Sequence, residues 1–295
     1  MWRFLPPQEN VMETWNQRAR LGTVVLFCLV ALASPAQTRK DMKYSVGPGA
    51  SVTVTNDYGP VTVHTAAGSQ VLATATLYSD QYEIDQSHSG SRVEFVTHPL
   101  QQKPTGDAAR VDFELTVPPG CAVTIHSSSG PVMVEKIRGD VSVDGDAANI
   151  DVHDVGNGHV HLRTLKGNIN VTNVSNGHVE ITSVSGPVVL NSVSGPSVEI
   201  NTTTGKIQYA GMFSNGDYQF TTHSGDIDIR LPANASIDFS ARSVNGKVES
   251  DFPFQPKQHT PYPVTAGRAF AGTSNSGASA VQLRSFSGTI RVKKQ

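Results

Sequence analysis

Two aspartates stand at alternate positions of the segment DIDI at residues 226–229. Side chains of a β-strand alternate between its two faces, so inward Ile227 and Ile229 would leave Asp226 and Asp228 both outward. A pair of carboxylates is the group that glycoside hydrolases use to cleave their substrates. One hypothesis is therefore a polysaccharide-active β-helix hydrolase or lyase with Asp226 and Asp228 as its catalytic residues.

The same two aspartates also fit an ion-pair ladder. Aligning successive repeats places six charged residues in two columns, with Lys206, Asp226 and Lys247 in the first and Asp228, Glu249 and Arg291 in the second. Exposed ion pairs of this kind are common and usually contribute little. We favour the ladder, and so we assign no catalytic residue and expect no enzymatic activity.

Histidines cluster in one part of the chain. His159 and His161 lie two residues apart, and His178 follows one repeat after His159. Imidazoles at such positions can hold Zn²⁺ or Cu²⁺. Because no cysteine or carboxylate completes a tetrahedral set, an outward polar row explains the same residues. We name these three as metal candidates and assign no metal.

Other chemistry finds little support in the sequence. Aspartates that could bind Ca²⁺ match neither an EF-hand loop nor the calcium nonapeptide, and they are also ordinary turn residues: Asp140, Asp144, Asp146, Asp151 and Asp154. Cys121 follows a Pro-Pro-Gly turn with no basic neighbour, which predicts a structural thiol. No nucleophile elbow, P-loop or dinucleotide fingerprint occurs, so no cofactor is expected.

The elements that position these residues are short repeated strands. Residues 158–174, 177–193 and 196–212 superpose, with Val160, Val179 and Val198 in one apolar column and a glycine between the two halves of each repeat. Each half alternates apolar and polar residues as a strand does. One repeat cannot bury its apolar face alone, whereas stacked repeats bury it and pair their backbones.

The repeat therefore predicts an all-β fold, a parallel β-solenoid of two-strand repeats about nineteen residues long over residues 121–295. A β-propeller and a β-sandwich are the competing folds. Columns in register at constant spacing favour parallel stacking over the antiparallel hairpins of those folds. The pattern makes about eight turns, with residues 281–292 as the final rung.

Residues 37–120 differ from the rest. A first rung begins near Val52, and longer strands follow at about 71–117, which predict an antiparallel β cap between this rung and the main stack. Residues 253–280 are rich in Pro, Gly, Ser and Ala with little periodicity, which predicts a projecting loop before the final rung.

Residues 1–36 are typical of a signal peptide. Arg18 and Arg20 precede an apolar run at 21–33, and small residues at 34–36 suit cleavage. The run is short for a membrane span, although an uncleaved anchor is the alternative. We expect export to the periplasm, the cell surface or the medium, with no membrane span in the mature chain. A net charge of −2 also argues against nucleic acid as a partner.

Several strands share the pattern G-[DNP]-[VI]-x-[VIL] after an SG or NG turn, as at residues 129–132, 185–188 and 224–227, with Ser-Gly-Thr-Ile at 287–290 as a variant. The segment 117–120 leads into the first strong rung at Val123. In these features the chain resembles the bacterial putative-adhesin family, over most of its length after the signal. The resemblance implies an exported β-solenoid domain of unknown function, and no functional residues are carried over.

Three functions stay open on these grounds. The first is a non-enzymatic, adhesin-like binding or cell-envelope module whose partner is an unknown protein or glycan on the envelope or cell surface. The second is the polysaccharide-active enzyme, although both tryptophans, Trp2 and Trp15, would leave with the signal and could not form sugar platforms. The third is a purely structural envelope scaffold. We favour the first.

Overall fold

The fold was examined in a computed structural model that describes residues 37–101, 104–257 and 267–295. These residues form one compact unit within Pro35–Gln295. The expected signal peptide at 1–36 lies outside the described residues. No helix in the described part of the chain is long and apolar enough to span a membrane.

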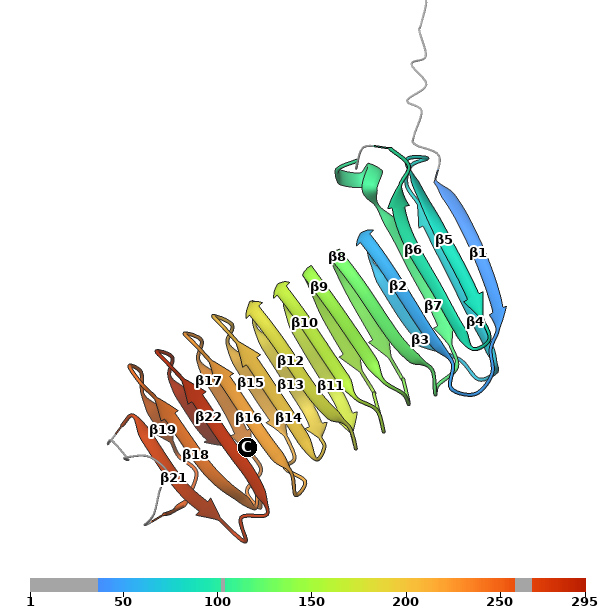
Figure 1. Cartoon of the computed structure of the whole chain (residues 1–295). Helices are drawn as coiled ribbons and strands as arrows, with labels where there is room; N and C mark the ends of the chain where they lie inside the picture. The colour runs from blue at the N-terminus through green and yellow to red at the C-terminus, as the bar shows by residue number, and fades with distance from the viewer. Residues whose placement is uncertain (1–36, 102–103, 258–266) are drawn as a thin grey trace, which may run out of the picture. The chain divides into compact units, whose positions relative to one another are not determined.

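The centre of the molecule is a parallel β-solenoid with two sheets, which we call sheet 1 and sheet 2 (Figure 1). Sheet 1 contains β10 (Val160–Lys166), β12 (His178–Ser185), β14 (Ser197–Thr202) and β16 (Asp217–Thr222) in this order. Sheet 2 contains β11 (Ile169–Ser175), β13 (Val188–Ser194), β15 (Ile207–Gly211) and β17 (Ile227–Leu231). β8 (Ala122–Glu135) and β9 (Val141–His153) run through both sheets.

The predicted register is confirmed in this part. Val160 pairs with Val179, which pairs with Val198, and all three side chains are buried. Each strand buries alternate side chains between the sheets, because the period-two pattern places its apolar residues on one face. The core is aliphatic at its centre, and aromatic residues such as Tyr209, Tyr218 and Phe220 fill it farther along.

The N-terminal end carries an antiparallel cap. β2 (Ser51–Tyr58) and β3 (Val61–Thr65) stack directly on β8, and β6 (Arg92–Pro99) and β7 (Val111–Val117) stack in parallel on β2 and β3. β4 (Gln70–Leu77) pairs antiparallel with β7, β1 (Thr38–Ser45) with β4, and β5 (Tyr82–Ser89) with β6. A short 3₁₀-helix, η1 (Gly106–Ala109), precedes β7.

The cap lies outside the first rung, whereas the sequence placed it between the first rung and the main stack. The reason is that the apolar residues of the first rung line up with those of β8. Val52 and Val54 pair in parallel with Val123 and Ile125, so the first rung continues the solenoid without interruption. The intervening strands therefore lie on the outer side of that rung.

The C-terminal end is stacked out of chain order. β22 (Ser279–Ser285) and β23 (Ile290–Lys294) lie between the rung of β16 and β17 and the rung of β18 (Ile237–Ser243) and β19 (Val248–Ser250). The rung that comes last in the sequence, β22 and β23, therefore lies inside the stack, and the rung of β18 and β19 lies at its end.

The segment expected as a loop at 253–280 contains two strands and the start of β22. β21 (Ala269–Ser274) pairs antiparallel with β18, and β20 (Gln255–Pro256) pairs with β21. Pattern analysis misses this strand because its inward positions are Phe270, Gly272 and Ser274, and only Phe270 is large and apolar. These three pair with the buried residues Ala241, Phe239 and Ile237 of β18. Together β20 and β21 cover the outer edge of sheet 1 at this end.

Candidate functional site

The turns that lead from sheet 1 to sheet 2 share a Ser/Thr-x-x-Gly motif. In four of them the buried hydroxyl accepts a hydrogen bond from the glycine N–H three residues later, at 2.8–3.0 Å: Thr202 with Gly205, Thr222 with Gly225, Ser285 with Gly288, and Ser243 with Gly246. Such side-chain bonds fix a turn locally. Each turn therefore presents its two middle residues outward in the same way.

Close stacking fixes these turns against one another. A Cβ atom added to Gly205 would lie 2.1 Å from the carbonyl oxygen of Gly186, and one added to Gly225 would lie 1.9 Å from that of Gly205. Only glycine allows this approach of backbone to backbone. The residues after each buried hydroxyl consequently form a continuous column along the stack.

That column is the turn stripe, made of Val184, Thr203, His223, Phe286 and Val244. Neighbouring members are held by backbone hydrogen bonds between their turns, as in Thr204 N–H to Val184 O and Val244 N–H to Ser285 O. Val184 and Phe286 are each 44% exposed and Val244 is 40% exposed. The stripe is an exposed, largely apolar line that crosses successive rungs.

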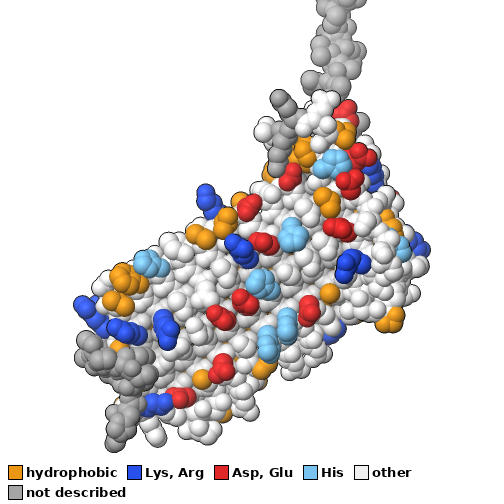
Figure 2. Space-filling view, in the orientation of Figure 1, with side chains coloured by type: hydrophobic (Ala, Val, Ile, Leu, Met, Phe, Trp, Pro, Cys, Tyr) orange, Lys and Arg blue, Asp and Glu red, His pale blue; other side chains and the backbone are white. Residues whose placement is uncertain are grey.

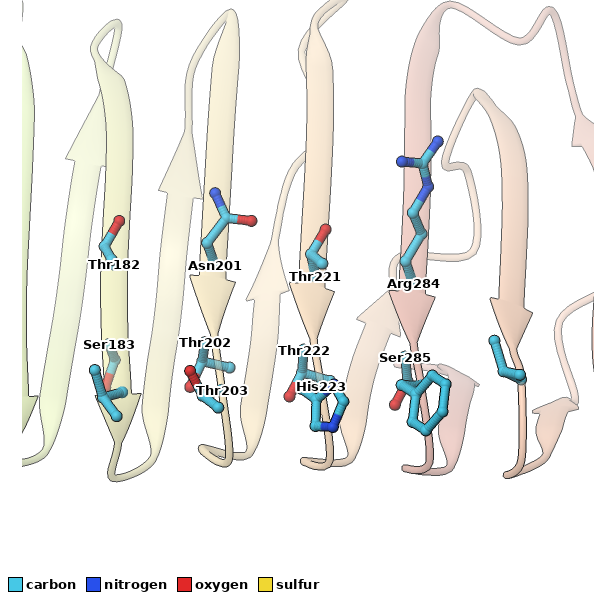
Figure 3. A pocket seen from close by; sticks show the side chains of 13 residues that line it. Thr182, Ser183, Asn201, Thr202, Thr203, Thr221, Thr222, His223, Arg284 and Ser285 are labelled. Atoms are coloured by element: carbon cyan, nitrogen blue, oxygen red, sulfur yellow. The ribbon is translucent and has the colours of Figure 1, made fainter.

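The turn stripe borders a shallow hollow of about 470 Å³, which we call the turn groove (Figure 3). One side is a row of residues from the outer face of sheet 1, paired strand to strand: Thr182, Asn201, Thr221 and Arg284. Between this row and the stripe lie the hydroxyl residues Ser183, Thr202, Thr222 and Ser285. The groove thus has polar, hydroxyl and apolar lines that run side by side across β12, β14, β16 and β22.

Two contacts shape the chemistry of the turn groove. The rings of His223 and Phe286 are nearly parallel, with an interplanar angle of 4° and centroids 4.9 Å apart. The side-chain amide of Asn201 donates to Glu199 Oε1 at 2.8 Å. Arg284 is exposed and is the one Lys, Arg, Asp or Glu residue in the groove lining. The groove therefore combines flat apolar surface, hydrogen-bonding groups and a single cation.

Charges of both signs are mixed over the face of the molecule seen in Figure 2, with uncharged surface between them.

The two aspartates proposed as catalytic residues form an ion-pair network. Arg291 Nη1 lies 2.8 Å from Asp226 Oδ2 and 3.3 Å from Asp228 Oδ1, and its Nε lies 3.6 Å from Glu249 Oε2. Lys206 Nζ lies 2.6 Å from Asp228 Oδ2. The structure thus brings Asp226 and Asp228 to one face, where cations from the neighbouring rungs neutralise them.

The environment of Asp226 keeps it ionised. Its partial burial raises its pKa, but hydrogen bonds from Arg291 and from the Thr289 N–H outweigh burial and hold the pKa below the ordinary value. A general acid for glycoside cleavage needs a raised pKa. The geometry of Asp226 therefore supports an ion-pair ladder.

The three candidate histidines do not meet at one point. His159 and His178 stack with centroids 5.0 Å apart, whereas His161 Nδ1 lies 3.3 Å from Glu180 Oε2. The backbone N–H of His159 donates a hydrogen bond to Asp140 Oδ1. Within residues 37–101, 104–257 and 267–295, no three or more His, Cys, Asp or Glu side chains are grouped so that they could hold a metal ion.

Two of the aspartates considered for Ca²⁺ form contacts within the protein, and Cys121 is buried. Asp154 accepts a hydrogen bond from the Asn173 amide at 3.1 Å, and Asp151 lies 3.1 Å from His153. Cys121 is fully buried, and burial raises the pKa of its thiol to about 11 despite an opposing hydrogen bond from the Val52 backbone. Such a thiol is almost entirely protonated at neutral pH.

Sequence reasoning did not find the turn groove. Its signature is the motif Ser/Thr-x-x-Gly with an apolar or aromatic residue at the first x, as in SVSG at 183–186, SFSG at 285–288 and SVNG at 243–246. Phe286 lies in a turn, where a single aromatic residue carries no periodic pattern. The alignment of β22 beside β16 is also needed to bring Phe286 to His223.

One family model matches the chain, and the solved structures that match it have low sequence identity. The model of the Toastrack DUF4097 family matches residues 51–293. A putative cell adhesion protein from Clostridium sporogenes ATCC 15579 has 10% identity and a TM-score of 0.31, with coverage of 88% of this chain and 100% of that one. A putative adhesin from Bacteroides fragilis NCTC 9343 has 11% identity and a TM-score of 0.42, with coverage of 88% and 98%. No curated protein matches the chain.

Proposed function

The chain belongs to the Toastrack DUF4097 family, and from this premise we propose that it is a non-enzymatic, adhesin-like binding module that holds a polymeric ligand along its turn groove. The observation that carries the proposal is the groove itself. Its polar row and its turn stripe each continue from rung to rung. A surface with a repeated lining suits a ligand with a repeated structure.

The apolar stripe supports binding more directly. Val184, Phe286 and Val244 are exposed at turns where a polar residue would fit equally well, and the rings of His223 and Phe286 add flat area between them. Contiguous exposed apolar surface rimmed by polar residues is typical of interaction sites. We therefore place the contact surface at the turns between the sheets.

The state of the acidic residues supports a module without catalysis. Asp226 and Asp228 are bound by Arg291 and Lys206, and the pKa of Asp226 is lowered. A carboxylate with a lowered pKa, such as Asp226, is a poor general acid at neutral pH. We further propose that the module is exported to the periplasm, cell surface or medium, as residues 1–36 suggest, and that its partner is a protein or glycan of the envelope or cell surface.

A binding screen tests this function. The full chain is applied to immobilised glycan and peptide arrays, beside the variants Phe286→Ala and Met212→Ala. Met212 is 66% exposed and lies outside the groove lining, so it controls for loss of a surface apolar side chain. Phe286→Ala should weaken binding about tenfold or more, as expected for an aromatic anchor, and Met212→Ala should not.

Two results would contradict the proposal. If Phe286→Ala binds as tightly as the wild type, the ligand contacts another surface. If no ligand binds on either array, the structural scaffold is favoured. Cleavage of a glycan by the wild type, lost in the double variant Asp226→Asn, Asp228→Asn, would instead establish the enzyme hypothesis.

A further inference from the structure

We propose that the ligand of the turn groove is an acidic polysaccharide, whose sugar rings lie against His223 and Phe286 while an anionic substituent meets Arg284. This inference rests on the proposed function and gives the chemical class of its ligand. It follows from three features of the groove: its aromatic pair, its charge and the pairing of its backbone.

The aromatic pair offers a platform for sugar rings. His223 and Phe286 come from neighbouring strands, are both exposed, and hold their rings within 4° of parallel. Sugars present apolar C–H faces that pack on aromatic surfaces and hydroxyl edges that need polar partners. Thr221 and the free side-chain oxygen of Asn201 stand beside the platform. An apolar surface with hydrogen-bonding groups along its edge matches both sides of a sugar.

The charge of the groove selects an acidic chain. Arg284 lies near the end of β22, two residues before Phe286 in the turn that follows, and no carboxylate lines the groove. Arg242 pairs beside Arg284 on the next strand, so a second guanidinium lies at that end. Glu199 and Glu180 lie farther from the turn, bound to Asn201 and His161. An anionic substituent therefore has its favourable position at Arg284.

The backbone of the turns argues against an extended peptide. Peptides that bind along β-structure usually add a strand to an unpaired edge. In the turn groove the backbone groups already bond from rung to rung, as in Thr203 N–H to Ser183 O, His223 N–H to Thr202 O and Phe286 N–H to Thr222 O. Recognition must therefore come from side chains, which suits hydroxyl-rich sugars that bring their own polar groups.

Matched polysaccharides test the inference. The full chain is titrated by calorimetry with polygalacturonate and with its methyl ester, which have the same backbone with and without charge. Dextran sulfate and dextran form a second pair, which separates sulfate from carboxylate recognition. We expect at least one acidic member to bind about tenfold more tightly than its neutral partner, and this preference to shrink at high salt.

Variants link the binding to the groove. Arg284→Gln should weaken the acidic ligand about tenfold, the scale of one charge-assisted hydrogen bond, and leave the neutral partner unchanged. Arg163→Gln is the control, because Arg163 occupies the same column on β10 beyond the groove lining. Phe286→Ala should weaken both members, and circular dichroism confirms that each variant is folded.

The outcomes separate this inference from the function on which it rests. Equal affinity for acidic and neutral members, still lost in Phe286→Ala, overturns the acidic ligand and keeps the binding function. Binding of peptides but no polysaccharide, sensitive to Phe286→Ala, overturns the glycan class alone. Binding that is insensitive to both Phe286→Ala and Arg284→Gln overturns the inference together with the groove.

Discussion

At the residue scale, outward polar side chains mainly join one rung to the next. Asp226 accepts a hydrogen bond from the Thr289 N–H, Asp140 accepts one from the His159 N–H, and Asn149 accepts one from the Asn168 N–H, each at 2.8–2.9 Å. Asp140 and Asp226 directly precede β9 and β17, and Asn149 lies within β9. Carboxylates that suggest chemistry in the sequence therefore stabilise the stack.

Asp226 provides a prediction about pH. Its pKa lies below the ordinary 3.8 in the folded chain, so its ion pair stabilises the fold above that value and this contribution disappears as pH falls through the folded pKa. Asp226→Asn should lower the free energy of unfolding by about 1 kcal/mol or less at pH 7, because the pair is partly exposed. The difference from wild type should shrink as the pH falls below 3.8.

Urea unfolding followed by circular dichroism at pH 7, 4 and 2 measures this difference. Asp217→Asn is the matched control, since Asp217 is exposed on the adjacent strand β16 and belongs to none of the ion pairs of the described residues. A constant deficit of Asp226→Asn at all three pH values would show that the ion pair is not its cause.

At the element scale, the turns set the spacing of the rungs. Gly205→Ala should lower the free energy of unfolding by about 1–3 kcal/mol, because the added methyl meets the Gly186 carbonyl oxygen 2.1 Å away. Gly120→Ala is the control, since no heavy atom lies within 4 Å of its added Cβ. Its effect on the free energy of unfolding should stay within about 1 kcal/mol, because the substitution acts only through the unfolded chain.

Thermal and urea unfolding of the two glycine variants supply the measurement. A Gly205→Ala variant as stable as Gly120→Ala would mean that the turn can shift outward at little cost. The groove beside it would then be adaptable, and the close stacking of the turns would not be what holds the turn stripe in line.

The elements differ in how much of them the sequence predicts. Strong alternation in Val160, Leu162 and their equivalents predicts both the strands and their parallel register. The sequence does not reveal β21 because only one of its three inward residues, Phe270, is large and apolar. The sequence does not reveal the turn groove, because its parts are single side chains in turns. Only the stacking of the turns makes Val184, His223 and Phe286 one surface.

At the scale of the whole molecule, the order of the last rungs is set by fit between side chains. The rungs at 237–250 and 279–294 carry the same apolar pattern, so pattern alone lets either follow β17. Chain order would place Glu249 beside Asp228. The observed order places Arg291 between them, so that charges alternate along the column. Like charges on adjacent strands are destabilising, which favours the inserted rung in this column, although the same order places Arg284 beside Arg242 in sheet 1.

Because of this insertion, β22 and β23 pair with a neighbouring rung on each side. Removing residues 279–295 would leave β16 and β17 without outer neighbours and would separate β18 and β19 from the stack. Amide hydrogen exchange should then show lost protection over residues 217–250, while β10 to β13 stay protected. Removing residues 1–45 is the control, because the strand that it takes away, β1, pairs with β4 and contacts β5 and β6 through Tyr44, and none of these strands lies in residues 217–250. Protection at 217–250 that survives the C-terminal deletion would mean that β18 and β19 can stack directly on β16 and β17, and that the inserted rung is not required to hold them.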